Sequence, residues 1–154
     1  YIQKIDKERL MEKVDVFGTL PEARFGHTLT FISKSKAVLF GGAVGDTGKY
    51  SITADTFSFD LVTRVWRKII GTGNKPSPRA AHGSASVEVN QLVVYGGATG
   101  GGSLASDDLY RLDLKDGEDS AYWSIISVVG TTPGRRYGHT LTYVKPFLVV
   151  FGGN

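Results

Sequence analysis

The stretch RYGHTLTYVKPFLVVFGG, residues 136–153, has two earlier counterparts in the chain. Each counterpart begins with an arginine, has a histidine three residues later, and ends an apolar run on a pair of glycines. The histidines His27, His82 and His139 lie 55 and 57 residues apart. The glycine pairs hold nearly the same period and are Gly41 with Gly42, Gly96 with Gly97, and Gly152 with Gly153. A fixed period of this length is typical of repeat proteins.

The remainder of each period carries aromatic landmarks. The motifs DTFSFD (55–60) and DLYRLD (108–113, with Tyr110) recur, and Trp66 and Trp123 follow 57 residues apart. Each period predicts four short strands, which begin at the histidine, fill the apolar run, contain the aromatic motif and carry the tryptophan. The apolar run has no polar face, so we expect it to be covered on both sides. Four antiparallel strands per period are what a β-propeller blade requires.

These landmarks resemble the kelch repeat, and the resemblance covers residues 13–154. It implies an all-β kelch propeller in which the paired glycines allow a tight turn and the tyrosine and tryptophan pack between blades. The combination of GHTLT, SPRAAH, SLASDDLYRLDL, TPGRRYGHTLTYV and VVFGGN further resembles the N-terminal propeller of the kelch-repeat Ser/Thr protein phosphatases of plants and apicomplexan parasites. In that family a metallophosphatase domain follows the propeller.

The repeats divide the chain unevenly. Repeat 1 spans residues 24–78, repeat 2 spans 79–135, and 136–154 are the first half of repeat 3. Residues 13–18 resemble the segment before the third arginine, which predicts the outer strand of a closing blade, and 1–12 are expected to be a charged tail or short helix. The partial propeller therefore holds about two and a half four-stranded blades, and we expect a ring of six, since propellers close with four to eight. We expect either a longer parent protein or self-association.

Composition narrows the class of protein. The 154 residues include no cysteine, which argues against a disulfide-stapled secreted domain or a cysteine-based metal site. A net charge of +3 is too small to predict nucleic-acid binding. The apolar runs are far shorter than the roughly 20 residues that span a bilayer. We therefore expect no membrane or nucleic-acid partner and an intracellular location, in the cytoplasm or nucleus.

The candidate binding surface is the side of the blades that collects the loops 43–54, 71–78, 98–107 and 130–135. Four arginines and one tyrosine lie at its rim: Arg24, Arg79, Arg135, Arg136 and Tyr137. Guanidinium groups there could pair with acidic or phosphorylated peptide segments. The alternative is that the arginines repeated in each blade brace strands or loop carbonyls, which leaves the unrepeated Arg135 as the free one.

Catalytic chemistry has little support in the sequence. The three repeated histidines suggest a metal site, but propeller symmetry spreads equivalent positions apart, so a structural role between blades is favoured. No nucleophile elbow is present. We expect a non-catalytic interaction module without a cofactor, which recruits substrates to, or regulates, an attached signalling phosphatase domain; two divalent metals would belong to that domain. The alternative is a kelch module of another scaffold or of a ubiquitin-ligase adaptor.

Overall fold

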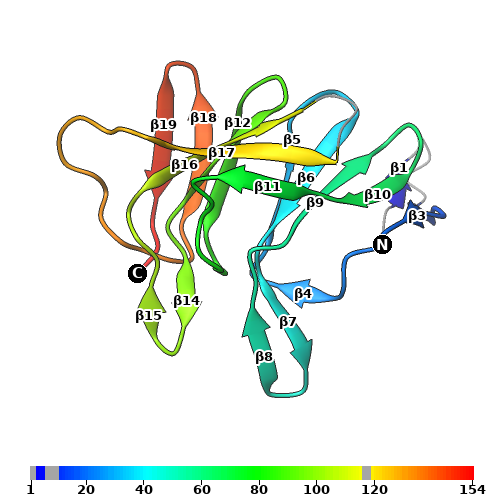
Figure 1. Ribbon diagram of the computed structural model, residues 1–154, viewed down its shortest axis with the longest axis horizontal. Helices are drawn as coiled ribbons and strands as arrows, with labels where there is room; N and C mark the ends of the chain where they lie inside the picture. Colours follow the sequence, from blue (N-terminus) through cyan, green and yellow to red (C-terminus); the bar gives the residue numbers. More distant parts are fainter. Residues whose placement is uncertain (1–2, 6–10, 116–118) are drawn as a thin grey trace.

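A computed structural model describes residues 3–5, 11–115 and 119–154, and every regular element in these ranges is a β-strand. The strands form a row of twisted sheets, with hairpins projecting from one end of the sheets (Figure 1). The described part of the chain contains no helix that is long and apolar enough to cross a membrane. The prediction of an all-β propeller fold is confirmed.

The first complete blade is a sheet of four antiparallel strands. Their order is β5 (Thr28–Phe31), β6 (Lys36–Phe40), β9 (Thr56–Asp60) and β10 (Val65–Lys68). The two central strands, β6 and β9, are buried along almost their whole length. The apolar run is therefore covered on both faces, as its composition predicts.

The second blade repeats this order and the third is half present. The second consists of β12 (Gly83–Glu88), β13 (Gln91–Tyr95), β16 (Leu109–Leu114) and β17 (Ser120–Ile126). The third contains only β18 (Thr140–Val144) and β19 (Phe147–Phe151), which pair antiparallel. Because Leu141 packs into a cluster with the second blade, this pair is docked rather than isolated.

Each complete blade also carries a fifth strand on its outer edge. The strand β3 (Phe17–Gly18) runs parallel to β10, and β11 (Ile70–Gly73) runs parallel to β17. The segment 13–18 was predicted as the outer strand of a closing blade, but its strand β3 is the outer strand of the first blade instead. The N–H groups of Phe17 and Thr19 donate, each at 2.9 Å, to the carbonyls of Arg64 and Trp66 along the open edge of β10.

The fifth strand arises from a switch between sheets at Ile69. The N–H of Ile69 donates to the carbonyl of Thr56 in the first blade, whereas the N–H of Ile70 donates to that of Asp119 in the second, both at 2.8 Å. The side chain of Ile69 is 5% exposed and lies in the core between the blades. The apolar segment around Trp66 therefore divides into β10 and β11 instead of forming one long strand.

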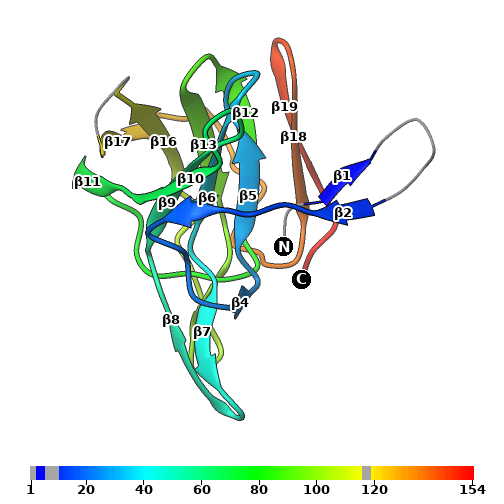
Figure 2. The same ribbon diagram turned by 90° about the vertical axis from the view of Figure 1, so that its right-hand side faces the viewer.

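An antiparallel hairpin precedes β3. It joins β1 (Gln3–Ile5) to β2 (Met11–Lys13) and lies outside the two five-stranded sheets (Figures 1 and 2). The prediction of a tail or short helix over 1–12 is wrong for these two segments, although residues 6–10 lie outside the described ranges. A short isolated helix is marginal in water, since stable ones need roughly 12–15 residues. Pairing as a hairpin instead lets the two segments satisfy each other's backbone hydrogen-bonding groups.

Two other hairpins project side by side from the lower end of the sheets in the view of Figure 1, away from β1–β2. They are formed by β7 (Ala43–Asp46) with β8 (Lys49–Ile52), and by β14 (Ala98–Gly100) with β15 (Ser103–Leu104). The short strand β4 (Arg24–Phe25) pairs with β7 at the base of the first. We call this side of the molecule the hairpin face.

The cores lie between the blades rather than within one sheet. Phe40 of the first blade contacts Trp123 of the second, with ring centroids 5.1 Å apart, and Trp123 is 1% exposed. A second cluster joins Val93 and Tyr95 of the second blade to Leu141 of the third. Each blade is thus stabilised by burying apolar surface against its neighbours.

Candidate functional site

The repeated arginines make the same hydrogen bond in all three blades. The Nη1 of Arg24 donates to the carbonyl of Gly41 at 3.1 Å, and that of Arg79 donates to the carbonyl of Gly96 at 3.0 Å. Arg136 donates in the same way to Gly152 at 2.9 Å. Each acceptor is the first glycine of a pair, so the arginine ties the start of its repeat to the end of the second strand.

Two of these arginines are inaccessible to a partner. Arg79 is fully buried and also donates from Nε to the Ser77 carbonyl at 3.1 Å. The side chain of Arg24 is 2% exposed and its Nη2 lies 3.6 Å from Asp55. Their burial argues against the predicted contact with a partner and agrees with the alternative, in which the repeated arginines brace loop carbonyls. Burial lowers the pKa of Arg79, the expected direction for a desolvated cation.

The other predicted contact residues lie nearer the surface. Arg136 is half-buried and donates from Nη2 to the carbonyl of Pro133. Arg135 is exposed, and Tyr137 is 40% exposed. Arg135 is the last residue of the 130–135 loop and Tyr137 lies two residues beyond it, and a binding role for this pair stays a prediction.

Two of the repeated histidines, His82 and His139, lie between blades, whereas His27 lines a hollow on the first blade. The Nε2 of His82 is 2.9 Å from Thr28 Oγ1 of the preceding blade, and burial, followed by the charge of Arg79, lowers the pKa of His82 to about 3. A Cβ on Gly41 would lie 2.9 Å from the His82 ring, so only glycine leaves room for it. No group of three or more potential metal ligands occurs among the described residues. This geometry agrees with the structural role.

An exposed aromatic pair on the hairpin face was missed by sequence reasoning. Phe25 of β4 and Tyr50 of β8 make an edge-to-face contact with centroids 4.9 Å apart, and they remain 54% and 51% exposed. Phe25 stands two residues before its histidine, the position that Tyr137 holds in the third repeat. Repeat register alone could therefore have indicated Phe25, whereas Tyr50 depends on the fold of its hairpin.

A groove of about 540 Å³ also opens between the first two blades, with Lys75 and Trp123 in its lining. Asp55 is the acidic group there. Its carboxylate is engaged by Arg24 at 3.6 Å and by Lys68 at 3.2 Å. Because these charges already compensate one another, we assign the groove a structural role at the junction between the two blades.

Four-stranded blades with a repeated arginine, histidine and glycine pair define the kelch class of β-propeller. The chain belongs to the KLHDC2/KLHL20/DRC7 Kelch-repeats domain family, which it matches over residues 2–154. The solved structure titled "Structure of YjhT" matches 96% of this chain and 48% of its own with a TM-score of 0.66. Its sequence identity is 18%, so this likeness concerns the fold.

Curated relatives are much longer than this chain. Adagio protein 3 of Arabidopsis thaliana is 36% identical over 136 residues, which cover 86% of this chain and 20% of the relative. Serine/threonine-protein phosphatase BSL2 of the same plant is 34% identical over 77% of this chain and 13% of its own length. Dynein regulatory complex subunit 7 of Chlamydomonas reinhardtii is 36% identical over 85% and 11%. The chain thus spans a fifth or less of each.

Proposed function

We propose that this kelch region is a non-catalytic protein-binding module and that it binds its partner on the hairpin face. The observation that carries the proposal is the exposed Phe25–Tyr50 pair, which joins β4 to the β7–β8 hairpin. Exposed aromatic side chains on a fixed scaffold supply large contact area at little entropic cost, and they are enriched at binding hot spots.

The charge on this face suggests the chemistry of the partner. The side chains of Arg24 and Arg79 are buried within the blades, whereas Arg135, two residues before Tyr137 in the sequence, is exposed. An exposed guanidinium suits a carboxylate or phosphate of a peptide segment, and exposed aromatic rings suit an apolar side chain of the same segment. Acidic or phosphorylated segments are therefore the class of ligand we propose.

The test is partner capture by matched surface variants. Tyr50→Ala and Arg135→Glu should each weaken binding at least tenfold in a pull-down followed by calorimetry. Lys34→Glu, which changes an exposed charge in the β5–β6 turn at the other end of the sheet, should leave binding unchanged. If all three variants weaken partner binding equally, or if none weakens it, the binding surface lies elsewhere.

We further propose that the parent protein is a Ser/Thr phosphatase, in which this region recruits substrates or regulates the catalytic domain inside the cell. Support comes from the 34% identity to phosphatase BSL2. The two divalent metals would then be held by that domain. The parent sequence should show GDxHG and GNHE motifs, and this chain alone should have no phosphatase activity.

A second candidate is a subunit of a larger assembly. It is favoured by the 36% identity to a dynein regulatory complex subunit over 85% of this chain. A parent sequence without the two phosphatase motifs, together with co-purification of a multiprotein complex, would favour this candidate over the phosphatase.

A further inference from the structure

Two dipeptides in the chain place a hydroxyl-bearing residue before a proline, Ser77–Pro78 and Thr132–Pro133. Proline-directed protein kinases phosphorylate serine or threonine in this context, where the proline holds the residue before it in an extended conformation. Both dipeptides lie in loops that lead into a repeat. The surroundings of the two hydroxyl groups differ in the structure, and they indicate which of the two suits a phosphate.

Ser77 lies on the surface, in the connection between β11 and β12 (Figure 1). Residues 75–79 form no strand, and the prolines on either side of Ser77 have no N–H group to donate to a sheet. The segment nevertheless lies where two complete blades meet, because the N–H of Arg79 in the second repeat donates to the carbonyl of Thr53 in the first at 3.2 Å. A kinase can therefore reach Ser77 without opening either blade.

A buried cation lies next to the Ser77 hydroxyl. The Nη2 of Arg79 donates to Ser77 Oγ at 3.1 Å, and Arg79 is 0% exposed. Arg79 also donates to the carbonyls of Ser77 and Gly96, but it forms no ion pair within the described part of the chain. Arg24, its counterpart in the first repeat, lies 3.6 Å from Asp55. The hydrogen bonds of Arg79 are therefore satisfied, whereas its charge lacks the anion that the first repeat provides.

The hydrogen bond between Arg79 and Ser77 is compatible with phosphorylation. Ser77 Oγ is the acceptor in this bond, so the hydroxyl proton that a phosphoryl group replaces takes no part in it. The phosphate would be attached to the atom that already lies 3.1 Å from Nη2, which brings its oxygens within reach of the same guanidinium. A phosphate beside an arginine forms strong charge-assisted hydrogen bonds.

The hydroxyl group of Thr132 is engaged in the opposite sense. Its Oγ1 donates to Asp107 Oδ2 at 2.5 Å and accepts from the N–H of Gly134 at 3.2 Å. Phosphorylation would remove the donated proton and set a doubly negative group against a carboxylate. Thr132 is also half-buried, whereas Ser77 is exposed. The structure therefore favours Ser77 over Thr132 as the position for a phosphate.

The first repeat shows that this position accepts a negative side chain. Glu22 stands two residues before Arg24, as Ser77 stands two residues before Arg79. The carbonyl of Glu22 accepts from Arg24 Nε at 3.2 Å, and the carbonyl of Ser77 accepts from Arg79 Nε at 3.1 Å. Glu22 is exposed, so the same loop conformation leaves an anionic side chain in solvent.

We propose that Ser77 is a site of phosphorylation by a proline-directed kinase, and that its phosphate pairs with Arg79 and strengthens the junction between the first two blades. The kinase transfers the γ-phosphoryl group of ATP to Ser77 Oγ. The Oγ–P bond forms, the bond from the γ-phosphorus to the bridging oxygen breaks, ADP leaves, and the hydroxyl proton passes to a base of the kinase. This role does not depend on which partner binds the hairpin face.

The first test locates the phosphate. The chain is incubated with ATP and a purified cyclin-dependent or mitogen-activated protein kinase, and the modified residues are identified by mass spectrometry. We expect about tenfold more phosphate at Ser77 than at Thr132, because of the carboxylate beside Thr132. Ser77→Ala should lose most of the incorporated phosphate. Incorporation that is absent at Ser77 with both kinases, or greater at Thr132, would overturn the proposal.

The second test measures the effect of the phosphate on the fold. Chains that carry phosphoserine at position 77, or phosphothreonine at position 132 as the control, are compared with the unmodified chain by thermal melting. Phosphorylated Ser77 should raise the melting temperature by about 2–5 °C, whereas phosphorylated Thr132 should lower it. Phosphorus NMR should show that the phosphate on Ser77 loses its second proton at lower pH than the phosphate on Thr132, because Arg79 stabilises the dianion. A melting temperature that is unchanged or lowered by phosphate on Ser77, or equal titration of the two phosphates, contradicts the pairing with Arg79.

Discussion

The Nη1 of Arg79 lies 3.0 Å from the carbonyl oxygen of Gly96, and both residues are buried. The bond crosses 17 residues of sequence and joins the entry of the second repeat to the exit of its second strand. It resolves the apparent conflict of a positively charged residue inside an apolar domain, because the guanidinium is satisfied by backbone carbonyls and faces the Tyr110 ring at 5.0 Å.

Replacing Arg79 should destabilise the domain strongly. Arg79→Met leaves the carbonyls of Gly96 and Ser77 without a donor, and we expect a loss of about 2–4 kcal/mol in the free energy of unfolding. Arg135→Met, at the exposed neighbour of the third repeat's arginine, should change it by less than about 0.5 kcal/mol. Urea denaturation of the two variants checks this, and equal midpoints would contradict it.

The glycine pair should be intolerant of any side chain. Gly96 has φ +67°, and a Cβ there would lie 2.5 Å from the Arg136 carbonyl oxygen and 2.6 Å from the His139 ring. Gly48 has φ +82° with open space around it. Both substitutions to alanine incur the left-handed backbone cost of about 1–2 kcal/mol, but only Gly96→Ala adds the clash. Thermal melting should therefore rank Gly96→Ala well below Gly48→Ala.

Stability should fall in acid because of His82. Its pKa is lowered from the ordinary 6.5 to about 3 in the folded chain, so the unfolded state binds the proton more readily. Stability is thus complete above about pH 6.5 and declines as pH falls toward 3, by up to about 1.4 kcal/mol per pH unit. His82→Gln should flatten this dependence in urea titrations compared at about pH 7.5 and pH 5. An unchanged slope would contradict the assignment.

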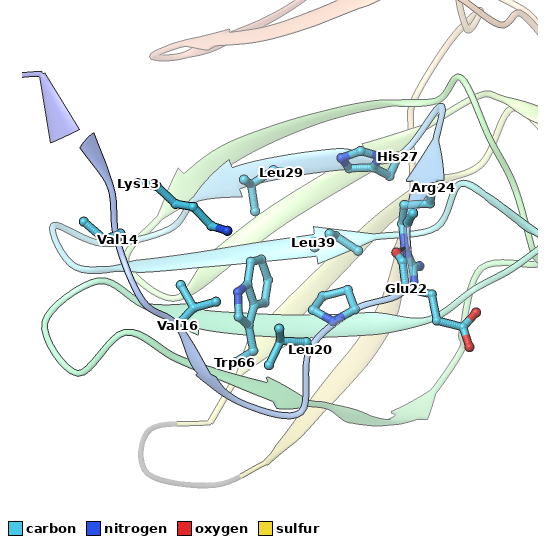
Figure 3. Close-up of a pocket in the computed structure, with 12 residues that line it drawn as sticks. Lys13, Val14, Val16, Leu20, Glu22, Arg24, His27, Leu29, Leu39 and Trp66 are labelled. Atoms are coloured by element: carbon cyan, nitrogen blue, oxygen red, sulfur yellow. Dashed lines mark hydrogen bonds between the residues drawn. The ribbon is translucent and has the colours of Figure 1, made fainter. Parts of the chain in front are cut away.

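The two tryptophans should differ as fluorescence probes. Trp123 is buried between blades, while Trp66 is half-buried and lines a hollow of about 460 Å³ on the first blade (Figure 3). Trp66 should therefore emit at longer wavelength than Trp123 and be quenched more readily by acrylamide. Trp66→Phe should remove the readily quenched component of the emission. If that component persists in this variant, the more accessible indole is not Trp66.

The blades could be predicted from the sequence because their landmarks are local and repeated. The apolar run before each glycine pair indicates a doubly covered strand, and Lys36–Phe40 and Gln91–Tyr95 are such strands. The switch between Ile69 and Ile70 could not be predicted, since two adjacent isoleucines look alike and the difference lies in which sheet accepts their hydrogen bonds.

The binding surface was harder to predict for a related reason. The repetition of Arg24 and Arg79 is equally consistent with binding a partner and with bracing loop carbonyls. Only the burial of their side chains distinguishes these two roles. The Phe25–Tyr50 pair joins residues 25 positions apart through a hairpin whose position is set by the fold. Contacts of this kind carry no periodic signal.

Because of the switch at Ile69, one sequence repeat does not coincide with one blade of the structure. A piece cut at the sequence boundaries, 24–78, would carry the edge strand β11 that belongs to its successor and would lack β3, which closes its own outer edge. Consecutive repeats therefore overlap, because the last strand of one repeat in the sequence joins the sheet of the next blade. Gene duplication that copies one period would add a blade without breaking the overlap, whereas excising a single blade for engineering requires cuts before Phe17 and after Ile69.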